Sequence, residues 1–476
     1  MPTKPSHGWP ILVTALAIYL LFASGYIDAV DASASIETAR ALVDRGSLRA
    51  TPDQVDYDYY ARTPGVCCYS KMGWVYPVLY TPAIAAAKLL RHLDPGRRIE
   101  GFLVSLVNPI LTALVVWVLF LFFARSHPPR TASLYATVIG FSSYLFPYSK
   151  TTHREPLQAL LLAAAFYIGS SSRLQESGAR RAGLVAVIFL ALANKTALII
   201  PLIPLGILVW HMSAPASRRV WMGLAALSIG ATLLISKIVF GSFLSGGYGD
   251  WVIGFDRRIW STPFLSGVYA QVFSIRSGYF AYSPCALLLL PVIAHKIKTR
   301  SFSPLDWALL TCFWSQVFLY AKWYSPLGSE ALGPRYLVPV TPVIGMLLNG
   351  FHWQQLTRKT ITALTVIVFL STSLQIINSS VKIQQYWTFQ SRSGASIPLP
   401  HWLVNIQFFA HKLSRQDEIY SLRSFGIPGD RQVNIADASS LQGFNFWWAH
   451  WRRSQKLNAT RSLHMTPSIQ VGLGDH

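Results

Sequence analysis

The sequence predicts an all-α polytopic membrane protein with about eleven transmembrane helices, within a range of about 10–13. Of the 476 residues, 52% are hydrophobic and only 13% are charged, and the mean hydropathy is +0.36. A soluble chain of this length carries roughly twice that charged fraction. Apolar runs of about 20 residues, long enough to cross a bilayer, recur along the whole chain. Composition and pattern therefore agree on the fold class.

The apolar runs give the predicted spans in chain order. The first run, Trp9 to Ile27, follows a short and weakly basic segment and lacks a small-residue cleavage site. We therefore interpret it as an uncleaved first span rather than as a signal peptide. The predicted runs lie at 9–28, 102–124, 131–147, 156–171, 182–193, 196–212, 221–240, 279–294, 305–322, 335–351 and 361–378.

Two regions leave the number of spans open. The 182–212 region is interrupted by ANKTA and by two prolines, so it predicts either two short helices or one kinked helix. The segment 74–90 is apolar enough to span the membrane, and an extra span there would reverse the predicted orientation of every later span. Its two prolines, short length and charges favour a helix that lies at the membrane interface.

The charges of the short loops predict the orientation. With a cytoplasmic N-terminus, the inside loops hold most of the loop arginines and lysines, as the positive-inside rule requires. These residues are Arg125, Arg130, Arg173, Arg180, Arg181, Arg218, Arg219, Lys296, Lys298, Arg300, Arg358 and Lys359. We attribute the net charge of +21 to cytoplasmic loops that face anionic lipid rather than to nucleic-acid binding, because no basic cluster accompanies a compact soluble domain. We expect a multi-pass protein of the bacterial inner membrane.

The same topology places three large segments outside the cell membrane. They are 29–100, which contains predicted interfacial helices, about 241–278, and 379–476. We accordingly predict a transmembrane domain at 1–378 and a small extracytoplasmic domain at 379–476 with mixed helix and strand. Its stretch FNFWWAHWRR, at 444–453, is unusually aromatic.

Several common sites receive no support from the sequence. There is no Walker-type phosphate loop, paired CxxC or HExxH, so an ATPase or a zinc protease is not indicated. No His/Asp cluster suggests a metal, and we predict no cofactor. Cys285 and Cys312 lie in apolar spans as packing residues. Cys67 and Cys68 are adjacent in a polar loop, where a vicinal disulfide, other pairing or free thiols all remain open.

The first candidate site follows the first span. In GYIDAVDAS, Asp28 and Asp31 come almost directly after the apolar run. A carboxylate beside a bilayer is costly unless it is solvated, paired or functional, and on the last turn of a helix it opposes the macrodipole. We therefore expect at least one of the two to be functional. ASIETARALVDRG then predicts an amphipathic helix that ends at Gly46.

Other charges gather at the predicted outer mouth. His153, Arg154 and Glu155 precede Pro156, and an acid followed by a proline also suits the start of a helix. Glu155 is thus either a helix-start residue or a site carboxylate. Lys195, within ALANKTALIIP, lies either near the outer interface or beside an acid as its buried partner.

The Gly/Pro-rich turn GSEALGPRY at 328–336 contributes a further group, with Glu330 and Arg335. An arginine at a membrane entry point often snorkels toward the interface. A guanidinium at this depth also suits a lipid phosphate, which it binds through a bidentate fork. Both interpretations of Arg335 stay open on the residues alone.

In their order, these motifs resemble the GT-C superfamily of integral-membrane glycosyltransferases. The similarity is to the bacterial branch near protein O-mannosyltransferases and aminoarabinose transferases, and it covers about 25–350. It rests on the order and spacing of GYIDAVDASASIETARALVDRGSL, YSKMGWVYPVLYTPAIAAAKLL, the Glu155–Pro156 pair, GGYGD at 246–250, SIRSGYFAYSPCALLLLP and GSEALGPRYLVPVTP.

The resemblance implies a transferase that takes a sugar from a polyprenyl-phosphate donor to a lipid, glycan or protein acceptor at the outer face. It implies Asp31, or alternatively Asp28, as the general base, and Arg335 as the phosphate ligand, helped by Lys71 or Arg154. Glu155 and Glu330 would orient acceptor or sugar, with His153 and Tyr336 nearby. Some members use a divalent metal, which this sequence does not support. Unlike some branches, Asp31 is followed by alanine rather than by a second acid, and the aromatic tail matches no family pattern.

Two other functions remain as alternatives. A transporter or flippase of lipid-linked saccharides should show repeated halves and charges near the middle of the membrane. This sequence places its charges at the outer mouth instead. A noncatalytic scaffold of the same fold would tolerate loss of Asp31 and Arg335, which an enzyme would not.

Overall fold

A computed structural model describes most of the chain. The described residues are 8–50, 68–71, 73–93, 98–174, 176–241, 243, 259–328, 331–350, 357–382, 385–386, 389, 400–414, 419–421, 432–434 and 445–448.

Helices dominate the described residues, with one short antiparallel pair of strands near the C-terminal end. The elements are α1 (Trp9–Phe22), α2 (Val30–Arg45), α3 (Val75–Leu89), η4 (Arg91–Leu93), α4 (Arg98–Ser105), α5 (Val107–Phe123), α6 (Pro129–Ser142), α7 (Leu145–Ser149), α8 (Glu155–Gly169), η5 (Ser172–Leu174), α9 (Gly178–Asn194), η6 (Thr196–Leu198), α10 (Ile199–Met212), α11 (Pro215–Phe240), α13 (Phe264–Val272), α14 (Tyr279–Tyr282), η7 (Pro284–Leu288), α15 (Leu289–Thr299), α16 (Pro304–Ala321), η8 (Arg335–Leu337), α17 (Thr341–Gly345), η9 (Met346–Gly350), α18 (Arg358–Ser380), α20 (His401–Ser414), β1 (Ile419–Ser421) and β2 (Gln432–Asn434).

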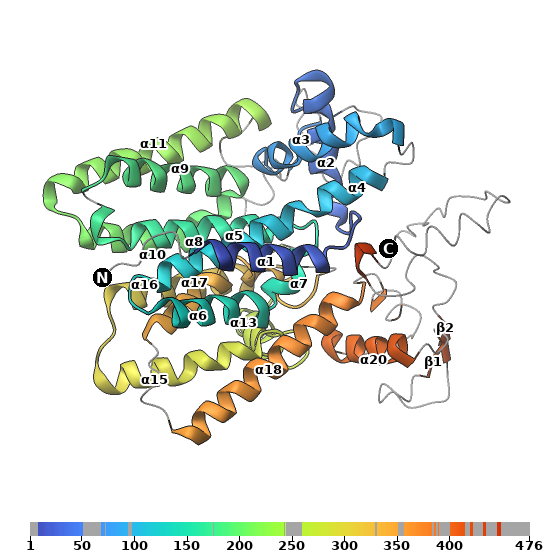
Figure 1. The fold of residues 1–476 in the computed structure, drawn as a ribbon. Coiled ribbons are helices and arrows are strands. Elements are labelled where there is room, and N and C mark those ends of the chain that lie inside the picture. The colour runs from blue at the N-terminus through green and yellow to red at the C-terminus, as the bar shows by residue number, and fades with distance from the viewer. Residues whose placement is uncertain are drawn as a thin grey trace.

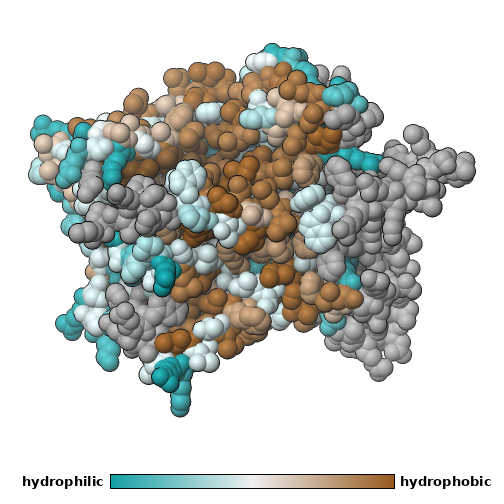
Figure 2. Space-filling model, viewed as in Figure 1, coloured by the Kyte–Doolittle hydropathy of each residue, from teal (hydrophilic) through white to brown (hydrophobic). Residues whose placement is uncertain are grey.

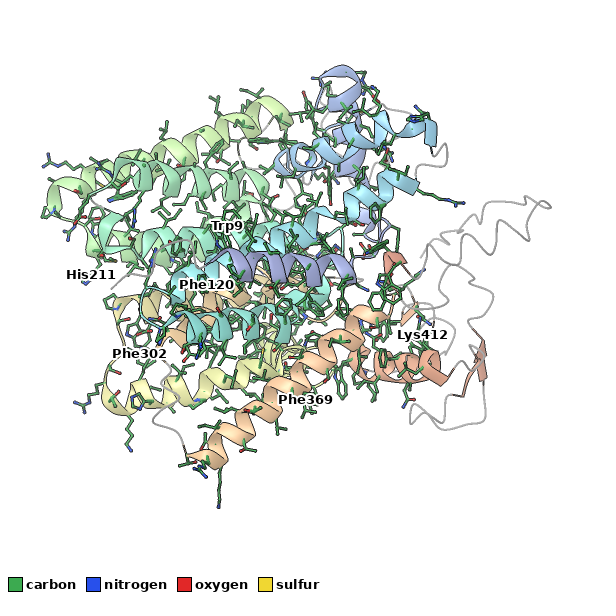
Figure 3. The ribbon with its side chains drawn as sticks, in the orientation of Figure 1. Trp9, Phe120, His211, Phe302, Phe369 and Lys412 are labelled. Atoms are coloured by element: carbon green, nitrogen blue, oxygen red, sulfur yellow. The ribbon has the colours of Figure 1, made fainter. Side chains whose placement is uncertain are left out.

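The long helices run in roughly one direction and form a bundle around α5 (Figure 1). α5 packs on α1, α6 and α8, and its Val115, Val116, Leu119 and Phe123 are buried. α2, α3, α20 and the strands lie at one end of the bundle, and the junction of α10 and α11 lies at the other. Figure 3 shows the same separation, with Lys412 at the first end and His211 and Phe302 at the opposite end.

The outer faces of the bundle are apolar. Exposed large hydrophobic residues follow α11, for example Leu227, Leu234 and Ile238, and α18, for example Phe369. Figure 2 shows a broad hydrophobic band across the middle of the molecule, with hydrophilic residues gathered toward its left-hand end. Arg98–Phe123, Pro215–Phe240 and Arg358–Ser380 are long and apolar enough to cross a membrane. These features confirm the predicted class, an all-α polytopic membrane protein, while the span count stays a prediction.

The first predicted span ends earlier than expected. α1 stops at Phe22 because Ala23 is extended (ψ 143°) and Gly25 takes a φ of 77°, which glycine adopts at little cost. α2 starts at Val30 and ends at Arg45, and Gly46, the predicted stop, caps it with a φ of 65°. Asp28 and Asp31 therefore lie at the start of α2 rather than on the last turn of α1. The expected conflict with the helix macrodipole was wrong, because acids are favourable at a helix N-terminus.

Four other regions resolve or correct sequence-based expectations. The 182–212 region forms two helices, α9 and α10, separated by Lys195 in an extended conformation. The segment 74–90 is helical, as α3, and packs on α2 and α4. The runs 279–294 and 335–351 form successive short helices rather than single long ones, because their prolines remove backbone donors.

Candidate active site

The segment 150–155, which joins α7 to α8, is the centre of the candidate site. Its carbonyl groups accept hydrogen bonds from side chains of α3 and α5. Tyr76 Oη and Asn108 Nδ2 donate to His153 O, at 2.8 Å and 2.7 Å, and Tyr80 Oη donates to Thr152 O at 3.1 Å. Because these donors are buried, the backbone of this segment is held in one conformation.

Asp28 contacts this segment directly. Its Oδ1 accepts hydrogen bonds from Thr152 N (2.7 Å) and Thr152 Oγ1 (3.0 Å). The amide of Ala29 donates to the same Thr152 hydroxyl at 3.1 Å. Thr152 thereby places the Asp28 carboxylate at the start of α2 and next to α8. Asp31 is the second residue of α2, and its side chain lies outside the described residues.

Lys150 lies on the same side of the segment as Asp28. It is buried, with 3% of its surface exposed, and its Nζ donates to Ser379 O at the end of α18. Burial lowers the pKa of Lys150 to about 7. The charge of Asp28 opposes this shift, whereas Lys412 and Lys382 add to it.

Glu155 and Arg335 form a buried ion pair. Arg335 Nε lies 2.7 Å from Glu155 Oε1, and the side chains are only 12% and 2% exposed. Glu155 is the first residue of α8, so the predicted helix start is confirmed, and the same residue meets the arginine of the GPRY motif. Tyr148 Oη and Tyr144 Oη donate to Leu332 O and Pro334 O, each at 3.0 Å, and so hold the turn that carries Arg335. Glu330 lies outside the described residues.

Three cations line a small cavity on the other side of the segment. Lys71, Arg154 and Lys195, together with Asn194, surround about 60 Å³ of space. Gly73 allows the loop before α3 to pack closely against the end of α9, because a Cβ at this position would lie 2.8 Å from Ala193 O. The cavity thus joins the loop before α3, the start of α8 and the junction between α9 and α10.

Lys195 is held above two aromatic rings. Its Nζ lies 5.0 Å from the ring centroids of both Tyr320 and Tyr336, and these two rings stack at 3.9 Å. A cation over such faces is stabilised by their quadrupoles. Tyr336 directly follows Arg335, so the GPRY motif reaches both the ion pair and the cation cavity.

A long apolar groove adjoins the cation cavity. It encloses about 610 Å³ between α9, α10 and α11, and almost all of its lining is hydrophobic, including Ile188, Ile203 and Trp221. Leu192 lines both the groove and the cation cavity, so the two spaces are neighbours. The combination offers an apolar surface that ends beside three positive charges.

The structure brings together most of the predicted site residues. Asp28 and Arg335 contact the segment 150–155, which includes Glu155, and Lys71 and Arg154 line the cation cavity. Tyr336 contacts Lys195, which also lines that cavity. His153 is buried beside Tyr148, with ring centroids 5.9 Å apart. Arg335 pairs with Glu155 and is not among the cavity-lining residues.

Sequence reasoning left three contributors out of the predicted site. Thr152 gave no signal, because an isolated threonine in a loop is common. Lys150 gave no distinguishing signal either, because the sequence contains many other lysines and arginines. Lys195 was noticed for its apolar surroundings, but only the fold showed that it lies beside Arg154.

Metal ligands do not cluster in this region. Within the part of the chain that the structure describes, no three His, Cys, Asp or Glu side chains come together as a possible metal site. Cys68 is disulfide-bonded, Cys285 and Cys312 are buried free thiols, and Cys67 lies outside the described residues.

Comparison with known proteins gives a structural match. No protein-family model matches the sequence, and no curated protein matches it either. The fold is similar to the crystal structure of ArnT from Cupriavidus metallidurans bound to undecaprenyl phosphate, with a TM-score of 0.50 and 10% sequence identity. The match covers 82% of this chain and 65% of the ArnT chain. At this identity the similarity establishes the fold, and the chain spans less than two thirds of the ArnT length.

Proposed function

We propose that the protein is a GT-C-type glycosyltransferase that moves a sugar from a polyprenyl-phosphate carrier to a lipid, glycan or protein acceptor at the outer face of a bacterial inner membrane. The observation that carries this proposal is the apolar groove that ends beside the cation cavity at Leu192. A polyprenyl phosphate has the same two parts, a long apolar chain and an anionic end. The ArnT-like fold, found in a structure with bound undecaprenyl phosphate, supports the same assignment.

In this proposal Lys71, Arg154 and Lys195 hold the carrier phosphate. Charge-assisted hydrogen bonds from such cations are stronger than neutral ones, and they stabilise the negative charge that develops on a departing phosphate. Arg335 acts next to them through its ion pair with Glu155, which neutralises that acid and orients it toward the site. The 610 Å³ groove takes part of the polyprenyl chain.

Asp28 is the proposed general base, with Asp31 as the alternative. The acceptor hydroxyl attacks the anomeric carbon of the sugar, the bond from that carbon to the phosphate oxygen breaks, and the hydroxyl proton passes to the carboxylate. A hydroxyl needs a carboxylate within hydrogen-bond reach in the transition state, which contributes roughly 10²–10⁴-fold to the rate. The two hydrogen bonds from Thr152 hold Asp28 for this task.

The test is a transfer assay in membranes that contain the full chain and radiolabelled polyprenyl-phosphate sugars. We expect Asp28→Asn to lower sugar transfer by at least roughly 100-fold, because the amide cannot take the proton. Asp44→Asn is the matched control, since Asp44 is about half exposed on α2 and pairs with Lys88 at the surface. It should leave transfer unchanged.

Other outcomes would change the assignment. If Asp31→Asn abolishes transfer while Asp28→Asn does not, Asp31 is the base. If neither aspartate substitution matters but Arg154→Gln does, the base lies elsewhere. If the wild-type protein transfers no sugar yet moves a lipid-linked saccharide across vesicles, the transferase proposal fails and the transporter takes its place.

A further inference from the structure

The aromatic tail of the sequence contacts the end of α1. Trp447 Nε1 donates to Leu20 O at 2.9 Å, Trp448 Nε1 donates to Leu21 O at 3.0 Å, and Trp447 N donates to Ala23 O at 3.0 Å. We call residues 445–448 the C-terminal clasp. It is separated from α1 by more than 400 residues of chain, since both indole contacts join positions 427 residues apart.

These contacts solve a general problem at the end of a helix. The last carbonyl groups of an α-helix have no partner within it, and a buried carbonyl without a partner is costly. An indole N–H is only a donor, so it suits an orphan carbonyl. The clasp supplies two indoles and one backbone amide. Ring contacts of Phe446 with Phe22 (5.2 Å) and of Trp447 with Phe102 (5.6 Å) fix its position.

Gly25 allows the clasp to approach this closely. A Cβ at Gly25 would lie 2.6 Å from Trp447 Cβ and 3.0 Å from its Cα, which no side chain tolerates. Gly25 also has a φ of 77°. The turn that follows α1 therefore has its shape because glycine and the clasp fit each other.

The clasp belongs to a closed set of contacts that surrounds Asp28. Asn445 N donates to Ser380 O at 3.0 Å, and the neighbouring Ser379 O accepts from Lys150 Nζ. Ser24 Oγ lies 2.9 Å from Tyr26 O and 3.2 Å from Lys150 O, so its one hydroxyl hydrogen is shared between these two acceptors. Asp28 closes the set through Thr152. Hydrogen bonds thus connect four parts of the chain: the end of α1, the clasp, the end of α18 and the segment 150–152. The Asp28 carboxylate belongs to this frame of hydrogen bonds.

We infer that the C-terminal clasp is a positioning element for Asp28, with Trp447 and Trp448 as positioning residues that act through the turn 23–28. The inference rests on the proposed function, because it gives the clasp a role in placing the proposed base. Without the clasp, Leu21 O and Ala23 O lose these donors, Leu20 O keeps only its 3.3 Å bond from Ala23 N, and the turn loses its fixed geometry. A displacement of about 1 Å at a reacting group is enough to slow catalysis by roughly 100-fold.

The first test compares two Trp→Phe substitutions on the full-length protein. Trp447→Phe keeps an aromatic ring but removes the donor to Leu20 O. Trp9→Phe is the control, because Trp9 lies at the other end of α1 and is 61% exposed. We expect Trp447→Phe to lower turnover by roughly 10-fold and to leave the affinity for undecaprenyl phosphate within about twofold of wild type. Trp9→Phe should change neither.

The second test uses glycines with matched backbone strain. Gly25→Ala and Gly46→Ala both place a side chain at positive φ, 77° and 65°, but Gly46 has no atom within 4 Å of its Cβ position. Both substitutions should therefore destabilise the local backbone conformation by a similar amount. Only Gly25→Ala should displace Trp447 and lower turnover.

Amide hydrogen exchange gives a readout that does not need an acceptor. In Trp447→Phe and Gly25→Ala, exchange in 23–29 should rise about tenfold or more, including at Ala29, while exchange in α5 stays unchanged. The inference is overturned if the two variants exchange in 23–29 at the wild-type rate. It is also overturned if they exchange faster there but keep the wild-type turnover. If the wild-type protein transfers no sugar, the proposed function fails, and exchange alone decides whether the clasp fixes this turn.

Discussion

The segment 150–155 separates two regions that are built differently. On one side, Asp28 and Lys150 belong to a frame of hydrogen bonds that includes backbone groups of α1, α18 and the C-terminal clasp. On the other side, Lys71, Arg154 and Lys195 surround a cavity of about 60 Å³ next to an apolar groove. The ion pair of Glu155 and Arg335 lies where the two regions meet.

The difference suits two different tasks. A general base needs a fixed direction, which short hydrogen bonds to a rigid backbone provide. A phosphate that arrives and departs needs positive charge from several sides, and three cations on separate elements supply it. Each of the following changes affects one region or their junction, so together they test whether the regions are distinct.

The largest expected effect is at the junction. Arg335→Met leaves Glu155 buried without its charge partner, which should destabilise the protein by roughly 3–5 kcal/mol. Lys88→Met is the control, because its pair with Asp44 has the same 2.7 Å separation but side chains that are 54% and 53% exposed. Lys88→Met should lower the free energy of unfolding by only about 0–1 kcal/mol. Thermal unfolding in detergent measures both.

A double variant separates the ion pair from simple packing. Arg335→Met combined with Glu155→Leu removes both members of the pair, so Glu155 is no longer buried without Arg335, and the double variant should be more stable than Arg335→Met alone. Equal losses in the single and double variants would show that the pair contributes nothing as a pair.

The second effect is confined to the cation cavity. Lys195→Gln should weaken the binding of undecaprenyl phosphate by roughly 10-fold, because a hydrogen bond to a charged group contributes about 1.5–3 kcal/mol and part of it is kept by the amide. Lys298→Gln, in the last turn of α15, changes the net charge equally and should not alter binding. Unfolding temperature should be similar in both variants. Equal weakening would mean that net charge, rather than the cavity, attracts the phosphate.

The smallest effect concerns Lys150 and depends on pH. Burial lowers the pKa of Lys150 to about 7 from 10.5, so the charged lysine costs folding stability. The cost is full below pH 7 and decreases as the pH rises toward 10.5, by about 1.4 kcal/mol per pH unit. Lys150→Met removes this cost and leaves Ser379 O without its donor at every pH.

The Tm of Lys150→Met relative to wild type should therefore fall as the pH rises. Between pH 7 and pH 8 the change should be roughly 1 °C for a chain of this length, measured by thermal unfolding in detergent at several pH values. A difference that stays constant with pH would show that Lys150 titrates normally and that the Asp28 side is open to water.

Much of the fold was predictable because the signals are local. All eleven apolar runs contain helical residues, Gly46 ends α2, and Glu155 with Pro156 begins α8. The runs at 279–294 and 335–351 were predicted as single spans, since hydropathy reports burial in lipid and does not report where prolines divide a helix. The early end of α1 reflects the backbone conformations of Ala23 and Gly25, which hydropathy does not report.

The sequence by itself determined the class of protein and the end of the bundle at which charged groups gather, because apolar length and charge are properties of short segments. Only the tertiary structure decided which charged groups meet. Arg335 and Glu155 are 180 residues apart, Thr152 and Asp28 are 124 residues apart, and both indoles of the clasp reach 427 residues along the chain. Contacts over such separations depend on how the helices pack, which no short stretch of sequence specifies.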